Sequence, residues 1–304
     1  MALKWVFNFK KTARIEVPDN GFSLGSGKGP TLLLVHGLTG TPSEMRFLGN
    51  YFSRRGYSVV CPRLADHGQP LEILKRAKWE SFYETVRETY LKVASQGPVY
   101  VAGLSMGALL SLLLAEEFPE KIAGVSCLSP TLFYDGWNVP WWARMLLPLA
   151  YFTPFRYYAY FKEEPPYGIK NEAVRRRVDE YYKNATLDNL KSADKYGYPY
   201  FPATAFYELR RLRLYLEKRL SRIHAPVQLV QAKDDDMTSV RNSQFLHDRI
   251  ASRTKEIVLL YNSYHVITAD QERETVAQKM EAFFNGLGGP SAGPETGVQG
   301  GSRS

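Results

Sequence analysis

The chain has 304 residues, of which 44% are hydrophobic, and a formal net charge of +8 at pH 7. This length suits one α/β domain with an insertion, and the hydrophobic content is that of a protein with a core. Acidic residues are also abundant, 31 against 39 lysines and arginines, and no nucleic-acid-binding module with interleaved basic and aromatic positions is present. We therefore expect no nucleic-acid partner.

The amino terminus and the cysteines indicate a cytoplasmic protein. Residues 1–11 contain no apolar segment of signal-peptide length, and charges or prolines interrupt every candidate for the ~18 apolar residues of a membrane-spanning helix. Cys61 and Cys127 lie in apolar strand-like runs, so we expect two reduced core thiols rather than a disulfide. Peripheral contact with a membrane stays an alternative, because basic residues flank the leucine stripe of residues 206–220.

From residue 31 onward, short β-branched or leucine-rich runs alternate with longer amphipathic runs, a pattern typical of parallel strands joined by crossover helices. The predicted strands are residues 31–35, 57–61, 99–104, 122–128, 227–232 and 255–260. The predicted helices are residues 42–55, 79–94, 106–118, 206–220, 240–250 and 270–284. The predicted fold class is therefore α/β, with a mostly parallel central sheet flanked by helices.

The regular alternation stops after residue 130 and resumes near residue 206. We interpret residues 131–205, where aromatics and prolines are crowded, as an inserted cap between two parts of one core, 1–130 and 206–286. Residues 287–304 are rich in Gly, Ser and Pro and cannot bury a core, so we expect a disordered tail there.

A candidate nucleophile lies in the segment Gly103-Leu104-Ser105-Met106-Gly107, which matches the G-x-S-x-G pattern. In this pattern the glycines let a strand turn sharply into a helix and leave the serine oxygen exposed at the edge of the sheet. The preceding residues have the composition of a buried strand and the following ones that of a buried helix, as the motif requires. This context favours Ser105 as nucleophile over an incidental serine at a helix N-terminus.

A serine hydroxyl needs a base within hydrogen-bond reach, which in this arrangement is a histidine late in the chain. His265 follows the last predicted strand and is the candidate general base. His247 lies inside a predicted helix and His224 precedes a strand, so neither is placed at the carboxyl end of a strand.

The acid that orients this histidine is expected after the strand at residues 227–232, where Asp234, Asp235 and Asp236 are consecutive. Chain order does not choose among them, because turns often carry aspartate for capping alone.

The oxyanion hole of this arrangement uses two backbone N–H groups. One comes from the loop after the first strand, here His36-Gly37-Leu38-Thr39-Gly40, and the other from the residue after the nucleophile. The candidate donors are therefore the N–H groups of Leu38 and Met106.

Together these motifs resemble the bacterial monoacylglycerol lipases and small thermostable carboxylesterases of the α/β-hydrolase superfamily. The segments that carry the resemblance are HGLTGTP at 36–42, PRLADHG at 62–68, GLSMG at 103–107 and NSYHVITAD at 262–270. The resemblance implies that Asp235 is the acid. It also implies a serine hydrolase that acts through an acyl-enzyme on a small-molecule ester or acylglycerol, with no cofactor and no metal.

The same triad would equally serve a thioesterase, a lysophospholipase, an amidase or a carbon–carbon bond hydrolase, since the fold does not set the substrate. A catalytically silent ligand-binding member of the fold is a further alternative. The complete triad argues against silence.

The sequence departs from the family pattern mainly around the substrate. Leu38 stands where the family commonly has phenylalanine, and Ala108 and Asp66 stand where it has glycine. The insertion is also longer than the family's cap and is rich in aromatic residues. These aromatics either form the cap's own small core or bind an acyl chain, and the candidates for acyl binding are Trp137, Trp141 and Trp142.

Overall fold

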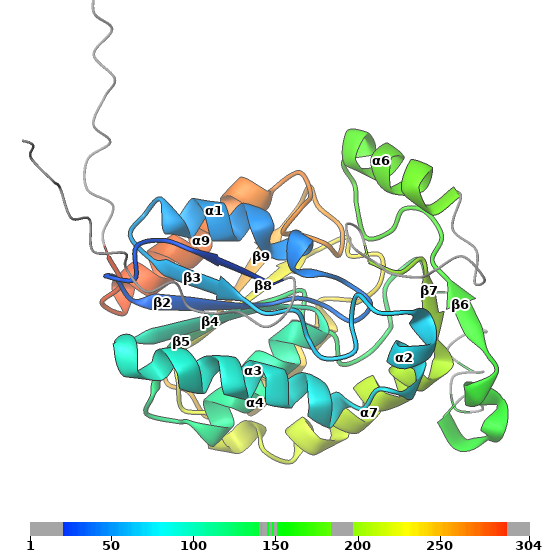
Figure 1. Cartoon of the computed structure of the whole chain (residues 1–304), viewed down its shortest axis with the longest axis horizontal. Helices are drawn as coiled ribbons and strands as arrows, with labels where there is room; N and C mark the ends of the chain where they lie inside the picture. The colour runs from blue at the N-terminus through cyan, green and yellow to red at the C-terminus, as the bar shows by residue number, and fades with distance from the viewer. Residues whose placement is uncertain are drawn as a thin grey trace, which may run out of the picture.

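The computed structural model describes residues 21–139, 151–183 and 197–290, together with Trp141, Met145 and Pro148. In these residues a central sheet lies between two layers of helices (Figure 1). The strands are β1 (Phe22–Leu24), β2 (Thr31–Val35), β3 (Ser58–Cys61), β4 (Val99–Leu104), β5 (Ile122–Leu128), β8 (Val227–Ala232) and β9 (Lys255–Leu260). Their order in the sheet is β1-β3-β2-β4-β5-β8-β9. Only β1 is antiparallel to its neighbour, so the mostly parallel sheet is confirmed.

All six predicted strands are present, and the start of β3 differs by one residue from its prediction. Strand β1 was not predicted, because three residues are too few for an alternating pattern to be recognised.

The helices cover both faces of the sheet. They are α1 (Arg46–Ser53), α2 (Leu71–Arg76), α3 (Trp79–Val93), α4 (Met106–Glu117), α6 (Glu172–Lys183), α7 (Ala203–Glu217), α8 (Arg241–Arg249) and α9 (Arg273–Gly286). Short 3₁₀ helices span Pro42–Met45, Ala94–Gln96, Pro154–Tyr157 and Leu220–Arg222. Helices α1 and α9 lie on one face, and α3, α4 and α7 lie on the other (Figure 1).

The period of two along each strand divides the core into two parts. In β2, Leu32 and Leu34 pack with α1 and α9, whereas Leu33 and Val35 pack with α3 and α4. The two cysteines follow the same division, since Cys61 belongs to the first cluster and Cys127 to the second. Both are buried free thiols, as predicted.

The predicted insertion contributes a second, smaller sheet. Strands β6 (Tyr160–Lys162) and β7 (Tyr200–Pro202) pair antiparallel, and Figure 1 shows them with α6 at one end of the central sheet. Helix α7 begins three residues before its predicted start, and its leucine stripe is buried against the core. The division into core and cap domains stays a prediction, and the predicted tail from residue 291 onward lies outside the described residues.

The order of the strands predicts a crevice at the carboxyl ends of the central strands β2 and β4. Strand β2 lies between β3 and β4, so the chain passes from β2 to β3 on one side and then crosses over to β4 on the other side. In open α/β sheets, ligands bind where the strand order reverses in this way, at the carboxyl ends of the strands. The loop after β2 and the turn after β4, which carry the candidate oxyanion donors and Ser105, therefore meet at this edge.

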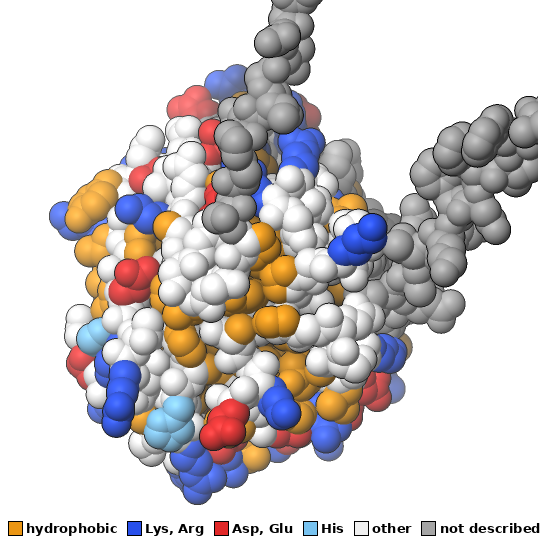
Figure 2. All heavy atoms as spheres, turned by 90° about the vertical axis from the view of Figure 1, so that its left-hand side faces the viewer, with side chains coloured by type: hydrophobic (Ala, Val, Ile, Leu, Met, Phe, Trp, Pro, Cys, Tyr) orange, Lys and Arg blue, Asp and Glu red, His pale blue; other side chains and the backbone are white. Residues whose placement is uncertain are grey.

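Figure 2 views the end away from α6, β6 and β7, where charged side chains of both signs surround a central area of apolar ones. None of the helices within the described residues has the length and hydrophobicity needed to span a membrane.

Candidate active site

Ser105 occupies a strained turn between β4 and α4. Its φ and ψ are 57° and −116°, a conformation rare for a residue with a side chain. Both motif glycines are required by close contacts, because a Cβ at Gly103 would lie 2.1 Å from the Gly107 carbonyl oxygen and one at Gly107 would lie 2.3 Å from that of Val35. The Ser105 N–H donates to the Leu128 carbonyl at 2.8 Å, which fixes the turn to the end of β5.

The Ser105 hydroxyl is hydrogen-bonded to a residue that sequence reasoning did not single out. Its Oγ lies 2.8 Å from Thr131 Oγ1, just beyond the end of β5. Thr131 is fully buried, and its hydroxyl also donates to the Ser129 carbonyl at 3.3 Å. His265 lines the same cavity, and in the described part of the chain no hydrogen bond joins it to Ser105.

Asp235 is the aspartate that contacts the imidazole ring of His265. Its carboxylate oxygens lie 2.9 and 3.1 Å from His265 Nδ1. They also accept the N–H groups of Met237 and Thr238 at 2.9 and 2.8 Å, the Thr238 hydroxyl at 3.1 Å and the Gln231 amide at 2.7 Å. This buried carboxylate is thus held in one orientation by groups from its own loop and from β8.

The two neighbouring aspartates have different surroundings. Asp234 is exposed, and its carbonyl accepts the indole N–H of Trp137 at 2.9 Å. Asp236 is buried, and its carboxylate accepts the N–H groups of His265 at 3.3 Å and Gly168 at 3.1 Å. Burial raises the pKa of Asp236 to about 6. Asp236 therefore contacts the backbone of His265, which is more than the capping role that a turn aspartate commonly has.

The charge state of His265 depends on several carboxylates. Burial alone would lower its pKa, but Asp235, through its charge and hydrogen bond, and then Asp236 and Glu44 through their charges, outweigh burial. The pKa of His265 therefore lies above its ordinary value. Asp235 favours the imidazolium in the way a triad acid does.

The loop after β2 runs beside Ser105. A Cβ on Gly37 would lie 3.4 Å from Ser105 Cβ, so the loop backbone approaches the serine closely. Leu38 lines the cavity from this loop, and Met106 is the first residue of α4, whose N–H has no acceptor one turn earlier within the helix. The Gly37 N–H donates to the Glu44 carboxylate at 3.3 Å. Burial raises the pKa of Glu44 to about 7.

A network of hydrogen bonds fastens the segment after β5 to the loop that carries Asp235. The Asn242 side-chain oxygen accepts the N–H groups of Leu132 and Phe133, both at 2.8 Å. The Gly136 N–H donates to the Met237 carbonyl at 2.9 Å. These contacts place residues 132–136 directly against the loop that carries Asp235 and the start of α8.

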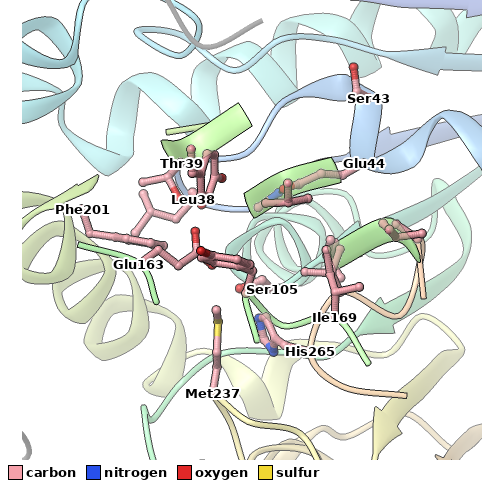
Figure 3. Close-up of a pocket in the computed structure, with 18 of the residues that line it drawn as sticks. Leu38, Thr39, Ser43, Glu44, Ser105, Glu163, Ile169, Phe201, Met237 and His265 are labelled. Carbon is pink, nitrogen blue, oxygen red and sulfur yellow. Dashed lines mark hydrogen bonds between the residues drawn. The ribbon is translucent and has the colours of Figure 1, made fainter. Parts of the chain in front are cut away.

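Ser105 and His265 open on one cavity of about 330 Å³, whose arrangement is shown in Figure 3. Its lining is mostly apolar and aromatic, and a large part comes from the insertion. The residues of the predicted insertion that line it are Tyr134, Glu163, Tyr167, Ile169, Val174, Val178, Tyr182 and Phe201.

Sequence reasoning did not identify these residues. Those of α6 carry a signal that could have found them, because Val174, Val178 and Tyr182 recur every four residues and so share one face of a helix.

Glu163 is an acidic side chain in this apolar lining. In Figure 3 it points from the β6 side of the site toward the space beside Ser105. Burial, with smaller contributions from Asp236 and Glu44, raises its pKa to about 8. The raised pKa favours the uncharged form of this carboxyl group.

The three candidate tryptophans lie differently from the lining residues. Trp137 is 57% exposed and packs edge-on against Tyr264, and Trp141 is 72% exposed. Neither belongs to the described lining of the cavity. Trp142 lies outside the described residues, and an acyl-binding role for this group stays a prediction.

Comparison with known proteins identifies the family. The model of the family described as "Serine aminopeptidase, S33" matches residues 28–272. This chain belongs to that family of α/β-hydrolases. The thermostable monoacylglycerol lipase of Bacillus sp. (strain H-257) is 31% identical over 257 residues, which are 83% of this chain and 89% of that protein. The carboxylesterase of Bacillus subtilis (strain 168) is 27% identical over 268 residues, 86% of this chain and 94% of that one.

Solved structures agree with this assignment. A structure reported with LipS and LipT, two metagenome-derived lipolytic enzymes, has a TM-score of 0.71 and 25% identity, covering 89% of this chain and 99% of that one. A soluble variant of the monoglyceride lipase of Saccharomyces cerevisiae has a TM-score of 0.72 at 17% identity, covering 93% and 99%, and shares the fold. The resemblance to monoacylglycerol lipases and carboxylesterases, which the motifs had indicated, is confirmed.

One departure from the family pattern has a visible structural consequence. Asp66, where the family commonly has glycine, adopts a positive φ of 65°. Aspartate tolerates this left-handed conformation better than most residues, and its carboxylate accepts the Ser81 hydroxyl at 3.2 Å.

Proposed function

We propose that this protein is a serine ester hydrolase of the carboxylesterase or monoacylglycerol lipase type, with a catalytic triad of Ser105, His265 and Asp235. The observation that carries the proposal is the buried His265–Asp235 hydrogen bond at 2.9 Å, because this oriented imidazole and the strained Ser105 line the same cavity. Nucleophile, base and orienting acid are the three parts that nucleophilic catalysis by serine requires.

The reaction has two halves. In the first, Ser105 Oγ attacks the ester carbonyl while His265 Nε2 takes its proton. His265 then returns that proton to the departing alcohol as the tetrahedral intermediate collapses to an acyl-enzyme. In the second, water attacks the acyl-enzyme, and His265 takes its proton and delivers it to Ser105 as the carboxylic acid leaves. Asp235 holds Nδ1 throughout and stabilises the imidazolium.

The negative charge on the carbonyl oxygen needs donors near Ser105. We assign this role to the backbone N–H groups of Leu38 and Met106, which lie on the two segments that meet at the crevice. Removal of one such donor typically costs about 3 kcal/mol of transition-state stabilisation. The Glu44 carboxyl contacts the N–H of Gly37, next to Leu38, and so supports the loop that supplies the first donor.

The substrate that fits best is a small neutral ester or acylglycerol. An apolar cavity of about 330 Å³ suits an acyl chain, and the names of the two bacillary relatives point to the same chemical class. Glu163, whose pKa is raised, adds a hydrogen-bonding group to the lining of the same cavity. A cap formed by residues 131–205 would then shape the acyl site.

A cytoplasmic location, with reversible contact to a lipid surface, is the setting we propose. Phe152, Phe155 and Tyr158 are each at least 60% exposed. Arg210 lies over the ring of Phe152. Aromatic and basic side chains together are typical of surfaces that meet a membrane interface.

The decisive experiment is the substitution Ser105→Ala. Hydrolysis of an activated ester should fall by on the order of 10⁴ in kcat, and labelling by a fluorophosphonate probe should disappear, while circular dichroism stays unchanged. Ser43→Ala is the matched control, because Ser43 is exposed at the rim of the same cavity and should keep activity and labelling. Substantial turnover by the Ser105 variant would exclude this nucleophile, and an unlabelled wild type would favour a silent ligand-binding protein.

A further inference from the structure

The hydrogen bond between Ser105 and Thr131 is the feature from which we argue. The two hydroxyl oxygens are 2.8 Å apart, a normal length for a hydroxyl–hydroxyl bond. Thr131 is fully buried, so water does not compete for its hydroxyl. The nucleophile therefore has a specific protein partner other than the imidazole that is to take its proton.

The second contact of Thr131 favours one of the two possible directions of this bond. Its hydroxyl has one proton, and the Ser129 carbonyl, which can only accept, lies 3.3 Å away. When Thr131 donates to Ser129, it accepts from Ser105. The Ser105 proton is then directed at Thr131 and away from the ring of His265.

The backbone fixes both partners in this arrangement. The Ser105 N–H donates to the Leu128 carbonyl, and the Ser129 N–H donates to the Val230 carbonyl, each at 2.8 Å. Strands β4, β5 and β8 thus set the positions of Ser105 and Ser129. Thr131 follows Ser129 by only two residues, so its position is restrained as well. The sheet thus determines the backbone positions from which the two hydroxyls meet.

We propose that Thr131 is a positioning residue that holds the free Ser105 hydroxyl in a resting orientation, and that acylation begins when the Ser105 O–H turns from Thr131 to His265 Nε2, which then takes the proton from Ser105 Oγ. This inference rests on the proposed function of Ser105 as nucleophile. The Ser105 O–H gives up its hydrogen bond to Thr131 and forms one to His265. This change requires only rotation about the Ser105 side chain before the attack on the ester.

The proposal predicts different effects on the rates of acylation and deacylation. Before acylation, Ser105 has a hydroxyl proton that Thr131 holds. In the acyl-enzyme, Ser105 Oγ is an ester oxygen without a proton, so the restraint no longer exists. Removal of the Thr131 hydroxyl should therefore accelerate acylation and leave deacylation unchanged, whereas general damage to the site would slow both.

The test uses Thr131→Val, which keeps the shape and removes the hydroxyl, with Thr131→Ser as the matched control that keeps it. Pre-steady-state hydrolysis of p-nitrophenyl acetate gives the acylation rate from the burst and the deacylation rate from the steady state. For Thr131→Val we expect acylation and fluorophosphonate labelling to be about three- to tenfold faster, the factor that corresponds to one ordinary hydrogen bond. Deacylation should be unchanged, and Thr131→Ser should stay within about twofold of wild type.

Other outcomes would overturn the inference. Slower acylation in Thr131→Val would mean that the hydroxyl assists the attack, and an unchanged rate would mean that the contact has no kinetic role. If the valine variant does not fold, Thr131→Ala provides the same comparison. These results are distinct from a failure of the proposed function, which would appear as activity or labelling that survives Ser105→Ala.

Discussion

Asp135 and Ser239 are joined by two hydrogen bonds of 2.8 Å, one from the Ser239 N–H and one from its hydroxyl. Asp135 belongs to the segment after β5 and Ser239 to the loop that carries Asp235. Asn242 bonds to the same carboxylate at 3.0 Å. The loop that carries Asp235 is thus also held by the segment after β5, and we expect replacements in this segment to affect the orientation of His265 indirectly.

Replacement of Asn242 tests this connection. Asn242→Ala would leave the buried N–H groups of Leu132 and Phe133 without their acceptor. An unsatisfied buried donor costs about 1–3 kcal/mol. We therefore expect the free energy of unfolding, measured by urea denaturation, to fall by about 2–4 kcal/mol. Asn50→Ala, at an exposed position of α1, should change it by less than about 0.5 kcal/mol. Equal stabilities would show that the network is dispensable.

The three adjacent aspartates should respond differently to replacement by asparagine. Asp235→Asn should lower kcat by on the order of 10⁴, because an amide stabilises the wrong imidazole tautomer and not the imidazolium. Asp234→Asn should stay within about tenfold of wild type, since this side chain is exposed. Asp236→Asn should give an intermediate loss together with lower thermal stability, because its carboxylate holds the N–H groups of His265 and Gly168. A nearly normal Asp235 variant beside a crippled Asp234 or Asp236 variant would show that Asp235 is not the acid.

The pH dependence of kcat/KM should report His265. Only the neutral imidazole accepts a proton from Ser105, so activity falls as the pH drops through the pKa of His265. Because that pKa is raised, the acidic limb should lie above the ordinary histidine value of about 6.5. Glu44→Gln removes one of the charges that raise it and should move the limb to lower pH. Glu274→Gln, at an exposed position of α9, should leave the limb in place, and an unmoved limb in both variants would exclude the influence of Glu44.

The acyl site can be located by reducing the cavity. Val178 is buried and lines it from α6, so Val178→Phe should remove space that a long chain occupies. We expect kcat/KM for decanoate esters to fall by about tenfold or more relative to acetate esters. Trp141→Ala should change both substrates alike, because Trp141 is exposed and lies outside the described lining. A selective loss for decanoate esters in Trp141→Ala, with equal effects on both esters in Val178→Phe, would place the acyl chain along the tryptophans.

Most strands and two of the candidate site residues could be predicted from the sequence, because they depend on properties local to the chain. Runs such as Thr31–Val35 and Ile122–Leu128 are apolar on both faces, as buried parallel strands must be. The Ser105 turn was recognisable because its two glycines are required by backbone contacts within and next to the turn. His265 followed from the position of a histidine after the last strand.

The tertiary structure alone decided which atoms meet in the site. The hydrogen bond of Asp235 to His265 spans 30 positions of the chain, and the bonds of Asn242 to Leu132 and Phe133 span about 110. Three consecutive aspartates are locally alike, and they differ only in what the folded chain places opposite each one. The bond between Ser105 and Thr131 has the same origin, since it exists because β4 and β5 are neighbours in the sheet and their carboxyl ends lie together.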